Sequence, residues 1–217
     1  DTFVREVLVP HFSRLDILVQ FSEHQKAFAD MEKIVTLKAN IPSEYVQRAR
    51  VKFLAKDTLG SISDLDKGIQ MLPTFMEAYF LRGKYHYEFG NNNEAIQDLN
   101  IYLLANEDDA EAYVIRGECY ARQNEYSLAA DDYSKAIEVE ADNPTYYFDR
   151  GFFYIQLQEF AKARVDFRKA IYFQHHDIKL AHFNLGIAEY KLENKLEACE
   201  NWRKSGEVGL DYLLKYC

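Results

Sequence analysis

Residues 145–171 read TYYFDRGFFYIQLQEFAKARVDFRKAI, and this stretch decides the fold. It contains an aromatic residue at Tyr147, the dipeptide Arg150-Gly151 after it, and a second aromatic position at Phe167. The same residue types recur 34 residues upstream, where the dipeptide is Arg116-Gly117. A fixed period of this length is the signature of a repeat architecture, so the sequence predicts stacked copies of one unit.

A 34-residue frame with the glycine in slot 8 aligns the copies along the chain. The copies cover residues 42–75, 76–109, 110–143, 144–178 and 179–212, and a degenerate copy covers 8–41. Slot 4 holds Tyr45, Tyr79, Tyr113, Tyr147 and His182, and slot 8 holds Ala49, Gly83, Gly117, Gly151 and Gly186. Slot 20 holds Ser61, Ala95, Ala129, Ala163 and Ala198, and slot 24 holds Leu65, Leu99, Tyr133, Phe167 and Trp202.

This order of aromatic, glycine, alanine and aromatic positions resembles the tetratricopeptide repeat over residues 42–212. The proline that the family carries in slot 32 is kept only as Pro73, which weakens the turn signal. The resemblance implies an all-α fold, a right-handed α-solenoid of antiparallel helix pairs, in a single domain over 1–217 with a short cap at 210–217. The last twelve residues, GEVGLDYLLKYC, resemble the tails of bacterial members of the family.

Helix geometry supports the same frame independently of the family. Slots 4, 8 and 11 lie on one side of a helix that turns by about 100° per residue, and slots 20, 24, 27 and 28 do the same for a second helix. Glycine inside a helix costs about 1 kcal/mol, so slot 8 needs a reason. We expect close approach of the second helix at the slot-20 alanine. Asn143-Pro144 and residues 90–93 supply the cap and turn signals.

Slots 7 and 23 carry an arginine and an aspartate that occur together. The pairs are Arg14 and Asp30, Arg48 and Asp64, Arg82 and Asp98, Arg116 and Asp132, and Arg150 and Asp166. In the last repeat both disappear together, as Leu185 and Asn201. Antiparallel helices bring these slots to similar height, so we predict a structural ion pair in each of five repeats. The alternative is two independent solvated charges, worth about 0–1 kcal/mol.

Composition excludes several classes of protein. A net charge of -9 disfavours nucleic-acid binding. No apolar run approaches the ~18 residues of a membrane span, so we expect no membrane insertion. The chain begins at Asp1, so a targeting signal could precede it, which leaves localisation open between cytoplasmic and exported, periplasmic. The cysteines are few, odd in number and far apart, which argues against a disulfide framework or a zinc site and predicts that Cys119 and Cys199 are packing residues.

No set of residues carries recognisable catalytic spacing, so the sequence predicts a protein that is not an enzyme and has no cofactor or metal. Neighbouring His175 and His176 invite a metal site, but solvated loop histidines are favoured. His86 and His182 occupy core slots and are interpreted as packing residues. Acidic stretches such as Glu107-Asp108-Asp109 are interpreted as solvated helix ends, with calcium binding a remote second.

In the family, slots 2, 5, 9 and 12 line a concave groove. The predicted peptide-binding residues are Phe80, Lys84, Tyr87, Val114, Phe148, Phe152, Ile155, Phe183, Ile187 and Tyr190. The clamp of lysines and asparagines by which some members hold acidic chaperone tails is missing. The sequence therefore predicts a protein-interaction scaffold whose groove binds an apolar or amphipathic peptide or helix of a partner protein. Two alternatives stay open: these side chains pack internally, or they form a homodimer by self-association.

Overall fold

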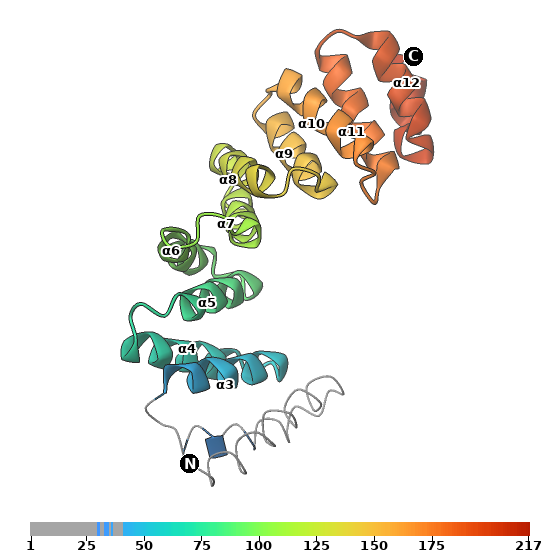
Figure 1. Ribbon diagram of the computed structural model, residues 1–217. Helices are drawn as coiled ribbons and strands as arrows, with labels where there is room; N and C mark the ends of the chain where they lie inside the picture. The colour runs from blue at the N-terminus through green and yellow to red at the C-terminus, as the bar shows by residue number, and fades with distance from the viewer. Residues whose placement is uncertain (1–29, 31–32, 35, 37–40) are drawn as a thin grey trace. The chain divides into compact units, whose positions relative to one another are not determined.

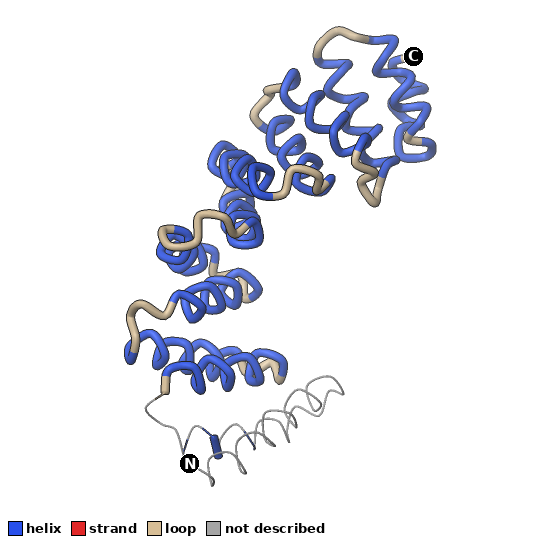
Figure 2. The backbone as a smooth tube through the Cα atoms, viewed as in Figure 1, coloured by secondary structure: helices blue, strands red, loops and turns tan. Residues whose placement is uncertain are grey.

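The computed structural model describes residues 30, 33, 34, 36 and 41–217. Within 41–217 the chain is helical throughout, with short connecting turns and no strand (Figures 1 and 2). The helices are α3 (Pro42–Leu54), α4 (Thr58–Met71), α5 (Met76–Glu88), α6 (Asn92–Leu103), α7 (Ala110–Arg122), α8 (Tyr126–Val139), α9 (Pro144–Gln156), α10 (Phe160–Tyr172), α11 (Ile178–Lys191), α12 (Lys195–Lys204) and α13 (Leu210–Tyr216), with a 3-10 turn at Gly206–Gly209.

The helices pack in consecutive pairs, α3 with α4 through α11 with α12. Helices α3, α5, α7 and α9 begin at the predicted repeat starts, and α11 begins one residue before its predicted start. The predicted all-α fold of helix pairs is therefore confirmed. The degenerate copy predicted at 8–41 lies almost wholly outside the described residues.

The chain divides into two compact units, one that ends at Ala105 and one that spans Asn106–Cys217. The first unit contains α3 to α6, and the second contains α7 to α13. The single domain expected over 1–217 stays a prediction.

Capping residues explain where several helices begin. Asn143 precedes Pro144, and its side chain accepts a hydrogen bond from the Thr145 backbone N–H at 3.1 Å, as the sequence predicted. Asp109 and Asp177 cap α7 and α11 in the same way. These acidic side chains satisfy backbone donors at helix starts and complement the helix dipole.

The glycines of slot 8 sit beneath the large side chains of slot 24. A Cβ atom added at Gly117 would lie 3.0 Å from Tyr133, and one at Gly186 would lie 2.5 Å from Trp202. Only at Gly83 does slot 20 appear among the nearest atoms, through the Ala95 carbonyl oxygen at 3.3 Å. We expected the glycine to accommodate the slot-20 alanine, and this expectation was wrong, because the nearest side chain comes from slot 24. The glycine makes room for a buried ring or leucine side chain from the second helix.

A disulfide joins Cys199 on α12 to Cys217 after α13, with their Cα atoms 5.9 Å apart. The expectation that Cys199 is a packing residue was wrong, because it is bonded to Cys217. The 3-10 turn at Gly206–Gly209 reverses the chain and returns α13 to α12, which brings the two cysteines together. Cys119 is buried and free, as predicted. A separation of 18 residues carries no signal for pairing until that reversal is known.

Candidate functional site

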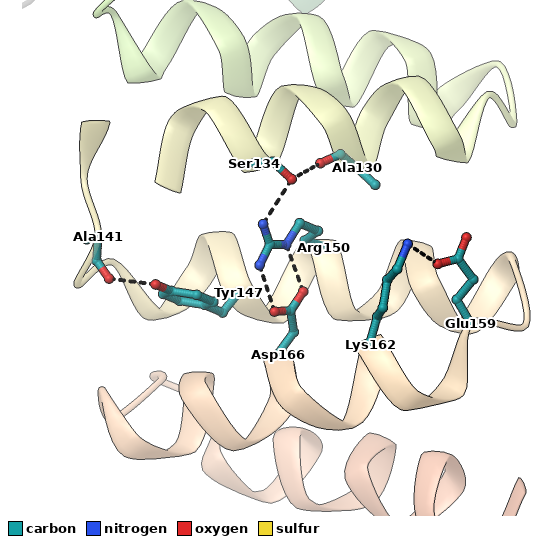
Figure 3. A network of polar contacts seen from close by, with 8 residues as sticks. All are labelled: Ala130, Ser134, Ala141, Tyr147, Arg150, Glu159, Lys162 and Asp166. Atoms are coloured by element: carbon teal, nitrogen blue, oxygen red, sulfur yellow. Dashed lines mark hydrogen bonds and ion pairs between the residues drawn. The ribbon is translucent and has the colours of Figure 1, made fainter. Parts of the chain in front are cut away.

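The predicted arginine–aspartate contacts are present in all four repeats that the structure describes at both positions. Arg150 donates from Nε and Nη2 to the two carboxylate oxygens of Asp166, each at 2.8 Å (Figure 3). Its remaining nitrogen donates to Ser134 Oγ of the preceding repeat at 2.9 Å. The same two-point contact joins Arg48 to Asp64, Arg82 to Asp98, and Arg116 to Asp132, at 2.5–2.8 Å. Arg14, the partner predicted for Asp30, lies outside the described residues.

These contacts are structural because the aspartates are buried. Asp166 is only 2% exposed, and its burial raises the pKa of its carboxyl, with the Arg150 hydrogen bonds acting against that rise. Burial by itself lowers the pKa of Arg150, but the hydrogen bonds and charge of Asp166 more than reverse this, and the pKa lies above its usual value. The two ionised groups therefore depend on each other, and neither is left available for proton transfer.

The last repeat replaces this contact with a different one. Leu185 has no charge to offer, and Asn201 instead accepts a hydrogen bond from His182 at 2.9 Å. Fully buried Glu189 on α11 accepts from Arg168 of the preceding repeat at 2.6 Å. The repeat frame gave no sign of this ion pair, because it occurs at one junction only.

The predicted binding residues of the second unit lie on its first helices α7, α9 and α11. We call Val114, Phe148, Phe152, Ile155 and Ile187 the first-helix face. Four of them are half-buried, and Phe152 is 42% exposed. Val114 packs against the cluster around Tyr133, and Phe148 and Ile155 pack against the cluster around Phe167. The face thus combines partly packed apolar side chains with one open aromatic ring.

Two further predicted binding residues are covered by the chain itself. The Phe183 ring lies 5.1 Å from Tyr212, and the Tyr190 ring lies 4.8 Å from Tyr216, between ring centroids. Both tyrosines belong to α13, so this helix occupies the part of α11 where the sequence predicted an open surface. For Phe183 and Tyr190 the internal-packing alternative describes the contacts.

In the first unit, Phe80, Lys84 and Tyr87 are half-buried on α5. The Phe80 ring packs beside Tyr102 of α6, at 5.0 Å between centroids, and the Lys84 ammonium lies 5.9 Å from the Phe80 ring centre. Because Phe80 already contacts its own second helix and a cation, it offers less open apolar surface than Phe152.

His175 is a buried residue and not a solvated one. It is 2% exposed and stacks on Phe148 with the ring centroids 4.3 Å apart. Burial lowers its pKa, so the ring is neutral near physiological pH. The prediction of a solvated loop histidine was wrong for His175 and fits His176, which is exposed. The loop that carries the extra residue therefore contacts Phe148 of the first-helix face through His175.

Sequence reasoning missed Asp149, which stands between Phe148 and the structural Arg150. Its carboxylate accepts a hydrogen bond from the Tyr133 hydroxyl at 3.3 Å. The pKa of Asp149 is raised to about 6, chiefly by burial and further by the negative charge of Glu118. The Tyr133 hydrogen bond and the charge of His176 lower this pKa and so oppose the rise. The equivalent slot in two earlier repeats is apolar, Leu81 and Ile115. The replacement of an apolar residue by aspartate in this slot is the signal in the sequence that could have identified Asp149.

We expect Asp149→Asn to stabilise the protein near pH 7.5 by about 1–2 kcal/mol. The folded state raises the pKa of Asp149 above its unfolded value of 3.8, so it binds a proton more tightly than the unfolded state does. The free energy of unfolding therefore falls as the pH rises from about 4 to about 6, and asparagine removes that loss. Urea unfolding of both proteins at several pH values measures it. A gain that persists at about pH 3 contradicts this assignment.

Two hollows are lined by residues other than those of the first-helix face. One, of about 660 Å³ in the first unit, is lined by charges that include the bonded Arg48, Asp64 and Arg82. The other, of about 400 Å³, lies on α10 and is lined by Val165, Arg168, Lys169 and Tyr172. In the first hollow these charges already hold the helices together. In the second, Arg168 is bonded to Glu189.

Within the described residues, no three histidine, cysteine or acidic side chains gather in a way that could hold a metal ion. None of the described helices is both long and apolar enough to cross a bilayer.

Comparisons with known proteins identify families and structures that are similar to this chain. Residues 80–144 and 144–174 match two models of the tetratricopeptide repeat. The sequence matches none of the curated proteins. Among solved structures, MamA is 24% identical, with a TM-score of 0.72 over 81% of this chain and 94% of that chain. The C-terminal part of a repeat protein from Cytophaga hutchinsonii is 19% identical, with a TM-score of 0.77 over 94% and 81%.

YrrB, described as a TPR protein with an unusual peptide-binding site, is 20% identical, with a TM-score of 0.67 over 80% of this chain and 89% of that chain. At these identities the structural likenesses concern the fold. Together with the two model matches and the helix pairs that begin at the predicted repeat starts, they lead to one conclusion. The chain is a tetratricopeptide-repeat protein.

Proposed function

We propose that the protein is a non-enzymatic interaction scaffold that holds an apolar or amphipathic segment of a partner protein on its first-helix face. The observation that carries this proposal is Phe152, an aromatic ring 42% exposed on a helix face otherwise lined by half-buried apolar side chains. Exposed aromatic anchors amid apolar neighbours are typical of binding hot spots, and repeat arrays commonly present such a face to partners.

The chemistry of the face selects among binding modes. Slots 5 and 9 of α9 and α11 carry Phe148, Phe152, Phe183 and Ile187, so no lysine there holds an acidic tail. Apolar side chains spaced three or four residues apart suit the apolar side of a helical or extended peptide. The peptide-binding site described for YrrB supports peptide binding as a use of this fold.

Phe152→Glu is expected to weaken the binding of apolar peptides by roughly 30-fold or more, because it places a charge where an aromatic anchor would be desolvated. The probe is a displayed library of short random peptides, selected on the wild-type protein and then measured one by one on each variant. Since Phe152 is already partly exposed, the variant should keep its fold, as circular dichroism and thermal unfolding would show.

Tyr172→Glu is the matched control, because Tyr172 is an exposed aromatic residue, at 75%, on second helix α10. It should bind the selected peptides as the wild type does. Equal binding by all three proteins, or unfolding of the Phe152 variant, contradicts the proposal. Sedimentation addresses the self-association alternative: a tight dimer that Phe152→Glu dissociates would assign this face to a second copy.

A further inference from the structure

We propose that Asp149 selects a lysine or arginine side chain in the segment bound on the first-helix face. This inference rests on the proposed function and names the partner chemistry that goes with it: an apolar segment that carries a cation. Asp149 lies in sequence between Phe148 and the α9 turn that ends in Phe152, so its carboxylate belongs to the same helix as both rings.

The surroundings of Asp149 differ from those of the three buried carboxylates of the second unit, Asp132, Asp166 and Glu189. Asp132 and Asp166 each receive two hydrogen bonds from an arginine, and Glu189 receives one. The hydrogen bond to Asp149 comes instead from the neutral hydroxyl of Tyr133. Among the described residues, no lysine or arginine is bonded to Asp149. Asp149 is therefore a half-buried carboxylate without the arginine that pairs with Asp132, Asp166 and Glu189.

The charged and titratable groups that face Asp149 come from three elements. They are Glu118 on α7, Tyr133 on α8 and His176 in the turn before α11. Glu118 raises the cost of ionising Asp149, and only His176 lowers it by charge. A cation brought by the partner would stabilise the ionised form of Asp149, whereas an anionic segment would be repelled by it. The net charge of -9 attracts the same class of partner.

The aromatic rings of Phe148 and Phe152 provide apolar surface on the same helix as Asp149. Phe148 is fixed by stacking on His175, and Phe152 is the open ring one turn along α9. Apolar side chains of the partner would pack on these rings and exclude water from the Asp149 carboxylate, which strengthens its attraction to a cation. The matching partner segment therefore alternates apolar side chains with at least one lysine or arginine.

Parallel selections from one displayed library of random peptides test the inference, with wild type and Asp149→Asn as the two baits. We expect the wild type to enrich apolar peptides that carry lysine or arginine, and Asp149→Asn to enrich apolar peptides without that preference. Replacing the lysine of a selected peptide by norleucine should weaken binding to the wild type by about tenfold and leave binding to the variant unchanged. Binding to the wild type should also weaken between about pH 7.5 and about pH 5.

The outcomes separate this inference from the proposed function. Peptides that lack a cation, or whose binding ignores both Asp149→Asn and the norleucine exchange, overturn the role of Asp149 and leave the apolar face standing. A wild-type selection that enriches no peptide overturns both. Enrichment of acidic peptides contradicts the charge argument directly.

A second inference comes from the disulfide and is independent of the first. We infer that the Cys199–Cys217 bond is a redox-released clamp that holds α13 over the aromatic residues of the last repeat. Helix α13 has seven residues and none of them is buried, and helices this short are not stable alone. Its rings nevertheless cover Tyr190 and Trp202 at 4.8–5.9 Å between centroids.

The chemistry needs a dithiol reductant, such as a redox-active protein with two neighbouring thiols. One of its thiolates attacks a sulfur of the Cys199–Cys217 bond, forms a mixed disulfide and releases the other cysteine as a thiol. The second thiol of the reductant then displaces the remaining cysteine. Two electrons and two protons pass to the protein, which gains two thiols, and the reductant becomes a disulfide. Cys217 is exposed, so its sulfur can be approached from solvent.

Trp202 is the single tryptophan of the chain and is 1% exposed, so its fluorescence reports on this clamp. Reduction by dithiothreitol should shift its emission to longer wavelength and speed amide hydrogen exchange in 210–216 by at least about tenfold. Cys217→Ser should show both changes without reductant. Cys119→Ser, the matched control at the free cysteine, should respond as the wild type does. Complete reduction, checked by thiol titration, that changes neither signal overturns the inference.

Discussion

Arg150→Ala is expected to lower the free energy of unfolding by about 3–5 kcal/mol. The guanidinium of Arg150 supplies both charged hydrogen bonds to Asp166 and one bond to Ser134 (Figure 3). Alanine would leave the carboxylate of Asp166 buried and ionised with no compensating charge. Breaking one side of a buried pair costs more than the pair contributes, because desolvation is no longer offset. Urea unfolding at neutral pH gives the value.

Two controls make the result specific to burial. Lys162→Ala removes the exposed ion pair with Glu159 shown in the same view and should have a far smaller effect. The double variant Arg150→Met, Asp166→Leu removes both charges and should recover most of the loss. The loss in the single variant should also shrink at acidic pH, because protonation neutralises Asp166. Losses for Arg150→Ala and Lys162→Ala that are indistinguishable would contradict the structural role.

Gly186→Ala is expected to destabilise the protein by about 1–3 kcal/mol or more, although alanine favours helices. The added Cβ would lie 2.5 Å from the indole of Trp202, and this side chain is buried at 1% exposure. Helix α11 would have to move away from α12. Thermal and urea unfolding measure the loss, and the Trp202 emission reports whether the indole moves.

Gly68→Ala is the matched control for this prediction. Gly68 is also buried inside a helix, but a Cβ there would meet its nearest atom, the Pro42 carbonyl oxygen, at 3.5 Å, which is ordinary contact. This substitution should be neutral or stabilise by up to about 1 kcal/mol, since the loss of glycine favours the helix. If both substitutions stabilise equally, slot 8 does not need its glycine and the account of the helix crossing is wrong.

Features that recur in every repeat could be predicted from the sequence. The period placed α3, α5, α7 and α9 to the residue, because a 34-residue spacing of small and large side chains repeats one helix crossing. The joint loss of Arg and Asp at Leu185 and Asn201 indicated that slots 7 and 23 meet. Such pairs are visible in one sequence because the chain supplies several copies of the same contact.

Features that occur once could not be predicted in this way. His175 is buried because one turn, with an extra residue, packs onto Phe148, whereas the three preceding described repeats keep the regular 34-residue spacing. The Cys199–Cys217 bond depends on the chain reversal before α13, which lies beyond the last full repeat. That reversal also covers Phe183 and Tyr190, which carry the same slots as half-buried Phe148 and Ile155.

The candidate site falls between these two cases. Phe152 was predicted from its slot, and the structure gives its exposure, which slot patterns alone do not determine. Asp149 was missed because, in the sequence alone, a charged residue beside Arg150 is most simply interpreted as a solvent-exposed side chain. Only the contacts around it, with the Tyr133 hydroxyl and near Glu118, identify a carboxylate that lacks the arginine bonded to Asp132 and Asp166.

Photo-crosslinking tests the central claim, that the first-helix face holds the partner segment, most directly. Benzoylphenylalanine would replace Phe152 in one protein and Tyr172 in another, since both positions carry exposed aromatic rings. With a peptide selected on the wild type, the account predicts a crosslinked product from position 152 and none from position 172. Crosslinking from position 172 alone, or equally from both, would contradict it.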